Sequence, residues 1–375
     1  MTTSTMKTSI PPSHEHPFAQ YVRVLGKGKK GSRSLTEAEA YDAMSMIMAG
    51  QVEDVQLGAF LMLLRVKEES PEELLGFVRA VRESITPQQN MAVDLDWSSY
   101  AGKRRHLPWY LFSILLLAER GHRVFIHGAS GHTIDRVYTE DVLRELGMGV
   151  AHSWSDCASQ LEQHHFTYFP LASLCPTLHR IIELRNIMGL RSPVHTLSRL
   201  LNPCNAPAVI QGIFHPGYRP VHQLAAQALG YEKVDVIKGE AGEIERNPDS
   251  ECLVQSVRDG ELSEEIWQPM FSKRHVKETE LDLGQFVAVW QGAKRHEYGE
   301  AAVVGTTAIA LKLLGEANNQ VSATELAQDL WPAAPPRGAG WPASKDRLPK
   351  RPPILALRRD SISLLPPRTR ARPRP

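Results

Sequence analysis

Three consecutive basic residues, Lys103, Arg104 and Arg105, lie where a phosphate-binding chain usually has glycines. They follow Gly102 and precede an apolar helix expected over 107–120, and a helix N-terminus attracts anions. Arg binds a phosphate through paired hydrogen bonds and Lys through a point charge. The three side chains are therefore candidates for binding a phosphate or the backbone phosphates of a nucleic acid. The alternative is a solvated run of charge, the usual state of such a sequence.

A glycine-rich loop near the N-terminus, GKGKKGSRS, carries a second group of positive charges. Such a loop could follow a phosphate backbone without contacting bases, or simply connect two helices in solvent. Its four candidate residues are Lys27, Lys29, Lys30 and Arg33.

Arginines form a third group in the middle of the chain. Arg180 and Arg185 are spaced to lie on neighbouring helix turns, and Arg191 and Arg199 follow them. Arg185 could bind a small carboxylate or join a polyanion groove with the other two groups. Salt bridges to acidic residues of the body are the alternative.

Two weaker candidates lie at expected strand ends. His127 ends an apolar strand, where open α/β sheets place ligands, although a lone histidine there is more often structural. Glu243 and Glu245 have the alternate spacing that puts two carboxylates on one face of a strand, which makes them at most a weak metal site.

The composition limits the class of protein. The formal net charge of +1 conceals a segment, 331–375, with eleven Lys or Arg and two Asp or Glu, so residues 1–330 carry −8. Any polyanion site in the body must therefore be a local patch. The four cysteines have no CxxC spacing, which indicates neither disulfides nor zinc, and the longest apolar run is too short to span a bilayer. We expect a cytoplasmic protein with no membrane partner.

The elements that must position these residues fall into four segments. Residues 1–16 and the Pro-rich, basic residues 331–375 are expected to be disordered, and the second of these could also be a frame-shifted extension. Cap and acidic first-turn signals predict three or four helices over 17–85, a helical dimerisation domain. Over 90–330, short strands alternate with helices, the pattern of a mainly parallel sheet covered on both faces. Strands are expected at 123–127, near Val150, and at 167–171, 208–214 and 233–239.

Four segments in order along residues 17–330 resemble the anthranilate phosphoribosyltransferases and class III nucleoside phosphorylases, which are glycosyl transferase family 3. They are LTEAEAYDAMSMIMAGQVEDVQLGAFLMLLRVKEESPEELLGFVRAV, VFIHGASG, LRNIMGLRSPVHTLSRLLNPCNAP and VIKGEAGEIE. The resemblance implies an α/β fold of phosphoribosyltransferase/nucleoside phosphorylase type, with an N-terminal helical domain and a large α/β domain around a mainly parallel sheet. The closest resemblance is to the divergent YbiB-type branch, which implies nucleic-acid binding by a homodimer.

Three of the family's four catalytic segments are altered here. The pyrophosphate loop GTGGD aligns with SSYAGKRRH (98–106), whose side chains obstruct a close approach of pyrophosphate. The family's KHGN becomes IHGA (126–129), which keeps only His127 and Gly128. The adjacent acids of GLDE, which help to hold magnesium in the family, become Glu243-Ile244-Glu245. Arg185 matches the family's anthranilate-contacting arginine.

Two functions follow from the resemblance and its departures. The first is a catalytically degenerate protein without a cofactor, which binds DNA or RNA non-specifically through basic loops of a homodimer. The second is a divergent glycosyl or phosphoribosyl transferase that retains magnesium, acts on an unidentified acceptor, and uses Lys103, Arg104 and Arg105 in place of the glycine loop.

Overall fold

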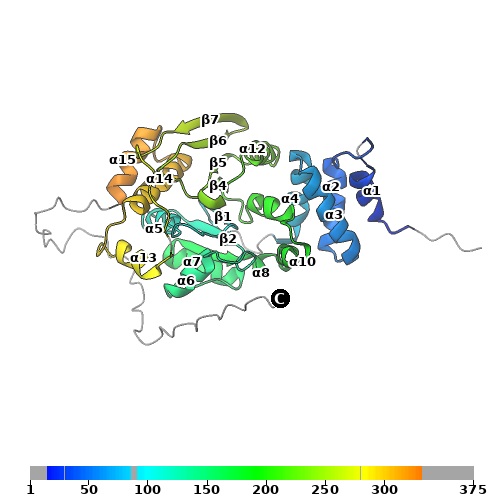
Figure 1. Cartoon of the computed structure of the whole chain (residues 1–375), viewed down its shortest axis with the longest axis horizontal. Coiled ribbons are helices and arrows are strands. Elements are labelled where there is room, and N and C mark those ends of the chain that lie inside the picture. The colour runs from blue at the N-terminus through cyan, green and yellow to red at the C-terminus, as the bar shows by residue number, and fades with distance from the viewer. Residues whose placement is uncertain (1–14, 29, 86–90, 279, 332–375) are drawn as a thin grey trace, which may run out of the picture.

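The computed structural model describes residues 15–28, 30–85, 91–278 and 280–331 (Figure 1). The two terminal segments expected to be disordered lie outside the described residues, apart from Glu15, His16 and Trp331, and Lys29 lies outside them too. All four cysteines are buried and unpaired. Within the described ranges, no helix has the length and apolarity needed to cross a membrane.

Four helices form the N-terminal helical unit: α1 (Ala19–Gly26), α2 (Glu37–Met48), α3 (Asp54–Lys67) and α4 (Pro71–Ile85). Helix α2 begins at a capping box, in which the Thr36 hydroxyl accepts the Glu39 N–H and the Glu39 carboxylate accepts the Thr36 N–H. Phe60 packs edge-to-face between Phe18 and Phe77 in the core of the unit.

The α/β domain is built on one seven-stranded sheet with the order β3-β2-β1-β4-β5-β6-β7. Its strands are β1 (Leu95–Ser99), β2 (Val124–Gly128), β3 (Phe166–Pro170), β4 (Ala208–Ile213), β5 (Lys233–Lys238), β6 (Cys252–Arg258) and β7 (Glu261–Trp267). Strands β1 to β5 pair in parallel, and β6 and β7 extend the sheet antiparallel. The mainly parallel sheet predicted from the sequence is confirmed.

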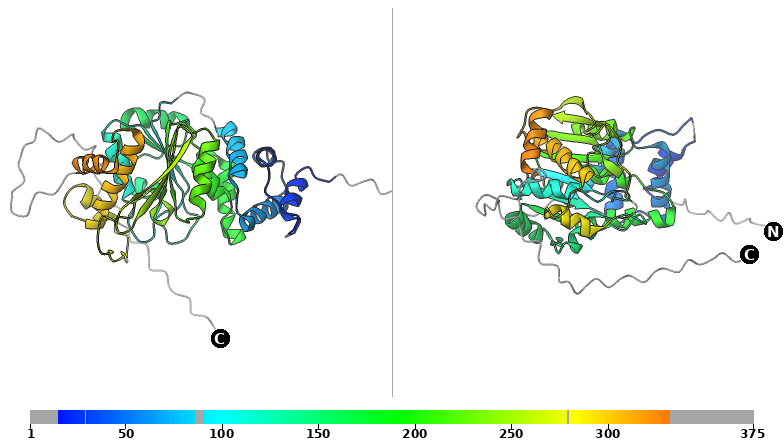
Figure 2. Two further views of the ribbon diagram at one scale, coloured as in Figure 1. Left: turned by 90° about the horizontal axis from the view of Figure 1, so that it is seen from above. Right: turned by 60° about the vertical axis from the view of Figure 1, so that its left-hand side comes forward.

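Helices cover both faces of this sheet (Figure 2). One face packs against α5 (Tyr110–Glu119), α6 (Thr139–Glu145), α13 (Leu283–Trp290), α14 (Glu297–Leu314) and α15 (Gln320–Leu330). The other packs against α7 (Trp154–His164), α8 (Leu171–Leu174), α9 (Pro176–Glu183), α11 (Val194–Leu197), the turn η1 (Ser198–Leu200) and α12 (Tyr218–Ala228). The short helix α10 (Arg185–Met188) follows α9, and the turn η2 (Glu240–Gly242) follows β5. Along β2, Val124 and Ile126 face the first layer and Phe125 the second, as strand alternation requires.

Several elements differ from the sequence-based expectation. The strand expected near Val150 is wrong, because Ala151 makes one hydrogen bond to the Tyr168 carbonyl (2.9 Å) and no ladder forms. Strand β1, which includes Ser98 and Ser99 of the expected loop, was missed, as were α13 and the β6–β7 hairpin. The hairpin had a signal in the sequence: Asp259 and Gly260 turn with φ of 49° and 86°, the geometry that an Asp-Gly pair favours.

Candidate functional site

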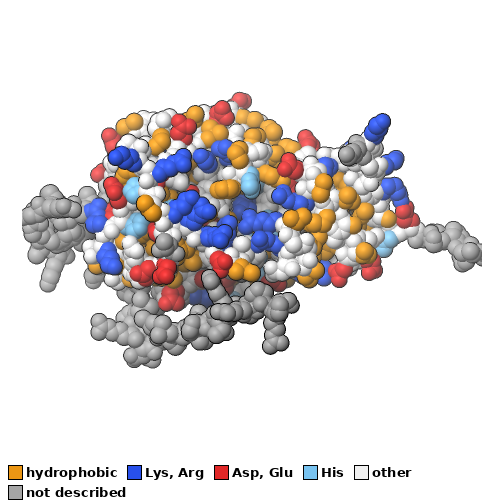
Figure 3. Space-filling model, in the orientation of Figure 1, with side chains coloured by type: hydrophobic (Ala, Val, Ile, Leu, Met, Phe, Trp, Pro, Cys, Tyr) orange, Lys and Arg blue, Asp and Glu red, His pale blue; other side chains and the backbone are white. Residues whose placement is uncertain are grey.

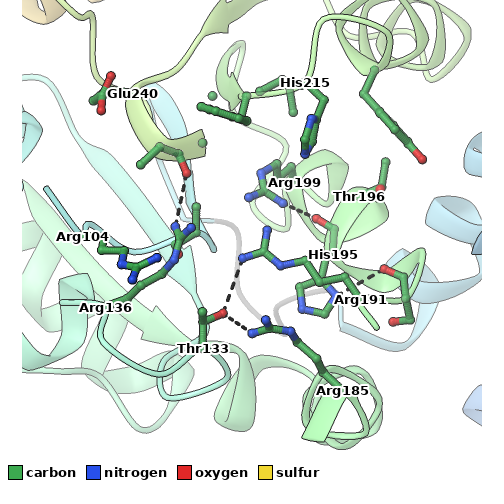
Figure 4. A pocket seen from close by; sticks show the side chains of 18 of the residues that line it. Arg104, Thr133, Arg136, Arg185, Arg191, His195, Thr196, Arg199, His215 and Glu240 are labelled. Atoms are coloured by element: carbon green, nitrogen blue, oxygen red, sulfur yellow. Dashed lines mark hydrogen bonds between the residues drawn. The ribbon is translucent and has the colours of Figure 1, made fainter. Parts of the chain in front are cut away.

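A cavity of about 620 Å³ lies at the carboxyl ends of β1, β4 and β5 (Figure 4). Ala101 follows β1, Ile213 ends β4 and Ala241 belongs to the turn after β5. Arg65 and Glu69, from the end of α3 and the loop after it, complete the wall, so both domains line the cavity. This edge of an open α/β sheet is where such folds bind ligands.

Arginine is the dominant residue in this cavity. Seven arginines line it against two carboxylates, and the arginines are Arg65, Arg104, Arg105, Arg136, Arg185, Arg191 and Arg199. The carboxylates are Glu69 and Glu240. Figure 3 shows Lys and Arg side chains gathered around the hollow in the middle of this face. The structure thus brings together five of the arginines singled out in the sequence: Arg104, Arg105, Arg185, Arg191 and Arg199.

Neutral oxygens hold these guanidinium groups in place. Nη1 of Arg185 donates to the His132 carbonyl (2.5 Å) and to the Thr133 hydroxyl. Nη1 of Arg136 donates to the carbonyls of Ala101 (2.9 Å) and Gly102 (3.0 Å). These bonds orient the arginines without cancelling their charge, so the cavity keeps a strong positive potential.

The positive charges also act on one another. Burial, together with the charges of Arg136, Arg199 and Arg185, lowers the pKa of Arg191 to about 10. Glu243 supplies a nearby negative charge to Arg136 and Arg199. Burying several cations with few counter-charges is unfavourable, and such clusters occur where a protein binds a ligand of opposite charge. The cavity is therefore suited to an anion that carries more than one negative charge.

Lys103 does not belong to this cavity, which corrects the expectation for the run 103–105. Its side chain is 1% exposed, and Nζ lies 2.5 Å from Oε1 of Glu245, whose side chain is fully buried. Oε2 of Glu245 also accepts the backbone N–H of Tyr110, at the start of α5, at 3.0 Å. Lys103 is thus a buried ion-pair partner, and only Arg104 and Arg105 of the run reach the surface of the cavity.

The loop that would hold an external phosphate in the family binds the chain's own carboxylate. Oε1 of Glu243 accepts the N–H groups of Ala101 and Gly102, both at 2.6 Å, and Oε2 accepts the Ser99 hydroxyl at 2.9 Å. Gly102 adopts a φ of +69°, a conformation that favours glycine and turns consecutive N–H groups toward one anion. Burial raises the pKa of Glu243, and these hydrogen bonds partly oppose the rise.

These contacts determine whether Glu243 and Glu245 have free oxygens to bind magnesium. Each of the four carboxylate oxygens of Glu243 and Glu245 already accepts a hydrogen bond or pairs with Lys103. Ile244, between them, is buried and apolar. The residues present therefore do not fit a magnesium–pyrophosphate site, since a hard cation requires several free oxygen ligands.

His127 and Gly128, the other candidates at a strand end, lie inside the fold. Nδ1 of His127 is 2.7 Å from the Tyr100 hydroxyl, and Nε2 is 3.2 Å from Oδ1 of Asp96. A Cβ on Gly128 would lie 2.1 Å from the Ser99 carbonyl oxygen, so glycine is required for the close packing of β1 and β2. Neither residue lines the cavity, and both have structural roles.

The remaining basic candidates lie away from the cavity. Arg180 is exposed on α9 and pairs with Asp54 at 3.5 Å, beside the turn between α2 and α3. The loop between α1 and α2, at the far end of the helical unit from the α/β domain (Figure 1), contains Lys27, Lys30 and Arg33. Arg33 makes two hydrogen bonds of 2.6 Å with the Glu39 carboxylate.

The sequence reasoning missed Arg65, Arg136, Glu69 and His195 as lining residues. Arg136 had a signal, because it lies in the segment after the strand 123–127 and parallel strands place such loops at the ligand-binding edge. The other three could not be placed without the packing of the helical unit and of α11 against the sheet.

Comparisons with known proteins identify the family of this chain. Residues 20–85 match the family described as glycosyl transferase family, helical bundle domain. An uncharacterized protein of Aquifex aeolicus is 30% identical over 243 residues, which span 64% of this chain and 73% of that protein. The chain belongs to glycosyl transferase family 3, the anthranilate phosphoribosyltransferase superfamily.

Two further members of this superfamily are similar to the chain in sequence or in fold. The uncharacterized protein YbiB of Escherichia coli K12 is 27% identical over 241 residues, which cover 62% of this chain and 73% of YbiB. The anthranilate phosphoribosyltransferase (TrpD) of Thermus thermophilus superposes with a TM-score of 0.70 at 21% identity, over 84% of this chain and 94% of that chain. The second likeness shows the shared fold of the superfamily.

Proposed function

We propose that this family member binds nucleic acid without sequence specificity through its arginine-lined cavity. The observation that carries the proposal is the imbalance of seven arginines against two carboxylates around one cavity. Phosphate contacts from arginine supply most of the affinity in non-specific binding and carry no base information. Arg104 and Arg105, exposed at the mouth, are placed to follow a phosphate backbone that extends beyond the cavity.

The engagement of the two glutamates supports a non-enzymatic function without a cofactor. Glu243 occupies the N–H groups of the loop, and Glu245 is held by Lys103. A transferred phosphoribosyl group requires its pyrophosphate to be bound and its developing charge to be stabilised. Neither requirement is met by a loop that already holds a carboxylate.

We also infer that the protein is a cytoplasmic homodimer that associates through the helical unit. Val55 and Val66 of α3 are 80% and 82% exposed, which leaves apolar surface on this unit uncovered in the single chain. Light scattering at micromolar concentration is expected to give twice the chain mass of 41.9 kDa. A monomer at that concentration would contradict the dimer and leave the binding proposal intact.

The alternative is a divergent transferase, magnesium-dependent and acting on an unidentified acceptor. It is favoured by the family scaffold and by Arg185, which lines the cavity as the matching arginine of the resemblance suggests. In that case the cavity would take a small phosphorylated substrate in place of a polymer, and release of pyrophosphate would be measurable.

A paired experiment separates the two functions. Binding of two unrelated DNA duplexes of equal length is followed by fluorescence anisotropy, and turnover of anthranilate with phosphoribosyl pyrophosphate and magnesium is assayed on the same preparation. We expect equal affinity for both duplexes and no turnover above a control without protein. Turnover well above that control, without DNA binding, would contradict the proposal and support the transferase.

The basic C-terminal segment needs its own control. Residues 331–375 carry a net charge of +9 and could bind DNA by themselves. A chain ending at Trp331 is expected to retain most of the affinity, whereas the Arg104→Ala/Arg105→Ala variant of the full chain is expected to lose affinity about tenfold or more. The opposite pattern would place binding in the C-terminal segment.

A further inference from the structure

One side chain in the arginine-lined cavity has a hydrogen-bonding character opposite to that of its neighbours. His195 belongs to α11, is 6% exposed and lines the cavity. Figure 4 places it among Arg185, Arg191 and Arg199. Arg199 donates to the His195 backbone carbonyl, which anchors this part of the chain. Guanidinium groups can only donate hydrogen bonds, so the state of the His195 ring decides whether it adds an acceptor beside these three arginines.

The surroundings of the ring define its tautomer. Nδ1 of His195 lies 3.2 Å from the Ser192 carbonyl oxygen. A carbonyl oxygen only accepts, so Nδ1 carries the proton and Nε2 presents a lone pair. Burial lowers the pKa of His195 well below its ordinary value, and the charges of His132, Arg191 and Arg199 lower it further. The ring therefore stays neutral, and Nε2 remains an acceptor throughout the physiological pH range.

Nε2 of His195 is buried and has no hydrogen-bonding partner among the described residues. Its neighbour His132, whose ring is 5.1 Å away, differs: Nε2 contacts the Tyr100 carbonyl at 2.9 Å and Nδ1 contacts the Thr133 hydroxyl at 3.1 Å. A buried acceptor without a donor is unfavourable, and in a binding cavity a ligand group can supply the missing donor.

A second histidine in the same cavity has the same tautomer. Nδ1 of His222 lies 2.6 Å from Oε1 of Gln211. Because an amide oxygen only accepts, Nδ1 of His222 is the donor of this hydrogen bond. Burial, with a contribution from Arg199, lowers the pKa of His222 to about 3, so its Nε2 is also a neutral acceptor. A ligand that combines negative charge for the arginines with a hydroxyl or amino hydrogen for Nε2 of His195 would therefore fit the cavity.

We propose that the cavity recognises ribose phosphate, with the 2′-hydroxyl donating to Nε2 of His195 while the adjacent phosphate binds Arg191 and its neighbours. This inference rests on the proposed nucleic-acid binding and specifies its substrate class as RNA in preference to DNA. The 2′-hydroxyl is the donor by which a protein distinguishes the two backbones at a given nucleotide, and it lies beside the 3′-phosphate. Arg191, whose Nη2 is 3.5 Å from the Thr133 hydroxyl, has no carboxylate partner among the described residues.

The test compares three short single strands of one sequence and length by fluorescence anisotropy: RNA, DNA and 2′-O-methyl RNA, which keeps the oxygen but lacks its hydrogen. One neutral hydrogen bond corresponds to a preference of about two- to tenfold. The wild-type protein is expected to prefer RNA over both other strands by this factor. Equal affinity for all three would overturn the inference while leaving nucleic-acid binding in place, and absence of binding to all three would overturn both.

Variants test whether His195 is responsible for the preference for RNA over DNA. His195→Leu is expected to lower the RNA affinity to that for DNA and to leave the DNA affinity within about twofold. His195→Gln is expected to keep part of the RNA preference, because its amide oxygen accepts a hydrogen bond. The control His179→Leu, on α9 outside the cavity, is expected to keep all of the RNA preference. An RNA preference that survives in His195→Leu would overturn the assignment. If that variant does not fold by circular dichroism, the 2′-O-methyl comparison in the wild-type protein decides.

A competition arm distinguishes a polymer from a free ribonucleotide. The 3′-monophosphates of adenosine (AMP) and of 2′-deoxyadenosine (dAMP), in which the phosphate lies beside the 2′ position, are added to the protein–RNA complex at equal concentrations. Stronger displacement by AMP than by dAMP supports ribose recognition and identifies the mononucleotide as sufficient. Displacement by neither, with the RNA preference intact, supports recognition within the polymer, and stronger displacement by dAMP would contradict the role of the 2′-hydroxyl.

Discussion

Lys103 and Arg104 are adjacent in the chain and have opposite environments. The Lys103 side chain is in the core, 2.5 Å from a carboxylate oxygen of Glu245. Arg104 is exposed at the mouth of a cavity in which seven arginines meet two carboxylates. The protein neutralises the positive charge of Lys103 with Glu245, whereas the positive charge of Arg104 is available to a ligand.

This contrast separates structural charge from functional charge. A buried cation is tolerated only with a partner, so Lys103 and Glu245 depend on each other for stability. The cavity arginines are held by neutral carbonyls and hydroxyls, so they contribute potential at some cost in stability. Substitution of the buried Lys103 should therefore lower stability, whereas substitution of a buried cavity arginine such as Arg191 should raise it.

The largest effect is expected from Lys103→Ala. Removing the lysine leaves Glu245 buried and unpaired, which should lower the free energy of unfolding by about 3–5 kcal/mol. Arg104→Ala, the matched control, should change it by less than about 0.5 kcal/mol. Urea denaturation followed by circular dichroism measures both. Equal stability of the two variants would contradict the assignment of Lys103 to the core.

Arg191→Met should raise the stability of the protein, in contrast to Lys103→Ala. It removes one of several mutually repelling buried cations, so stability should rise by about 0.5–2 kcal/mol. Nucleic-acid affinity should fall about tenfold or more, because a charge-assisted hydrogen bond to phosphate is lost. Thermal melting and anisotropy on the same sample test this trade-off, and a loss of stability would show that Arg191 is structural.

A smaller effect, visible only as a pH dependence, is expected at Glu69. Burial raises the pKa of its carboxyl to about 7, partly opposed by its own backbone N–H and by Arg65. Because the folded pKa exceeds the ordinary value of 4.5, Glu69 destabilises the fold increasingly as the pH rises from 4.5 through 7. Its ionisation also adds negative charge to the cavity wall.

Nucleic-acid affinity should consequently fall several-fold between about pH 6 and pH 8 at constant salt. Glu69→Gln should remove most of this dependence and should be more stable than the wild type at the upper end of that range. A variant with the wild-type pH profile in both measurements would show that another group is responsible.

The smallest effect is expected in the basic loop of the helical unit. Lys27→Ala/Lys30→Ala should change affinity by no more than about twofold, since exposed charges distant from the bound phosphates are screened by salt. Arg33 already pairs with the Glu39 carboxylate. Its hydrogen bonds lower the pKa of Glu39 to about 2; burial opposes this shift, and hydrogen bonds from Thr36 add to it. Anisotropy at about 0.15 M salt measures the change, and a tenfold loss would extend the binding surface to this loop.

Much of the fold could be predicted from local sequence signals. The cap before Glu37 and the alternation of helices with short apolar strands were sufficient for the helical unit and the parallel sheet. Strand β1 was not predictable in this way, because LDWSS is short and mixed in polarity, and its five buried residues depend on β2 and β4 on either side. The grouping of Arg104, Arg105, Arg185 and Arg191 follows from their positions at one edge of the sheet.

The buried contacts behind the cavity could not be predicted from local sequence. Lys103 and Glu245 are 142 residues apart, and a run of three basic residues does not show which member turns inward. His127 was a candidate from its strand-end position, but its partners Tyr100 and Asp96 come from neighbouring parts of the β1 segment. Contacts between distant segments decide both cases.

The salt dependence of DNA binding tests the central claim most directly. Each neutralised phosphate contributes roughly 0.7–0.9 to the slope of log K against log salt. The Arg104→Ala/Arg105→Ala variant should flatten the slope by about 1.4–1.8, whereas Lys27→Ala/Lys30→Ala, which removes the same charge, should leave it unchanged. Equal slopes for the wild type and the Arg104→Ala/Arg105→Ala variant would show that these cavity arginines do not contact phosphate, and would contradict the account.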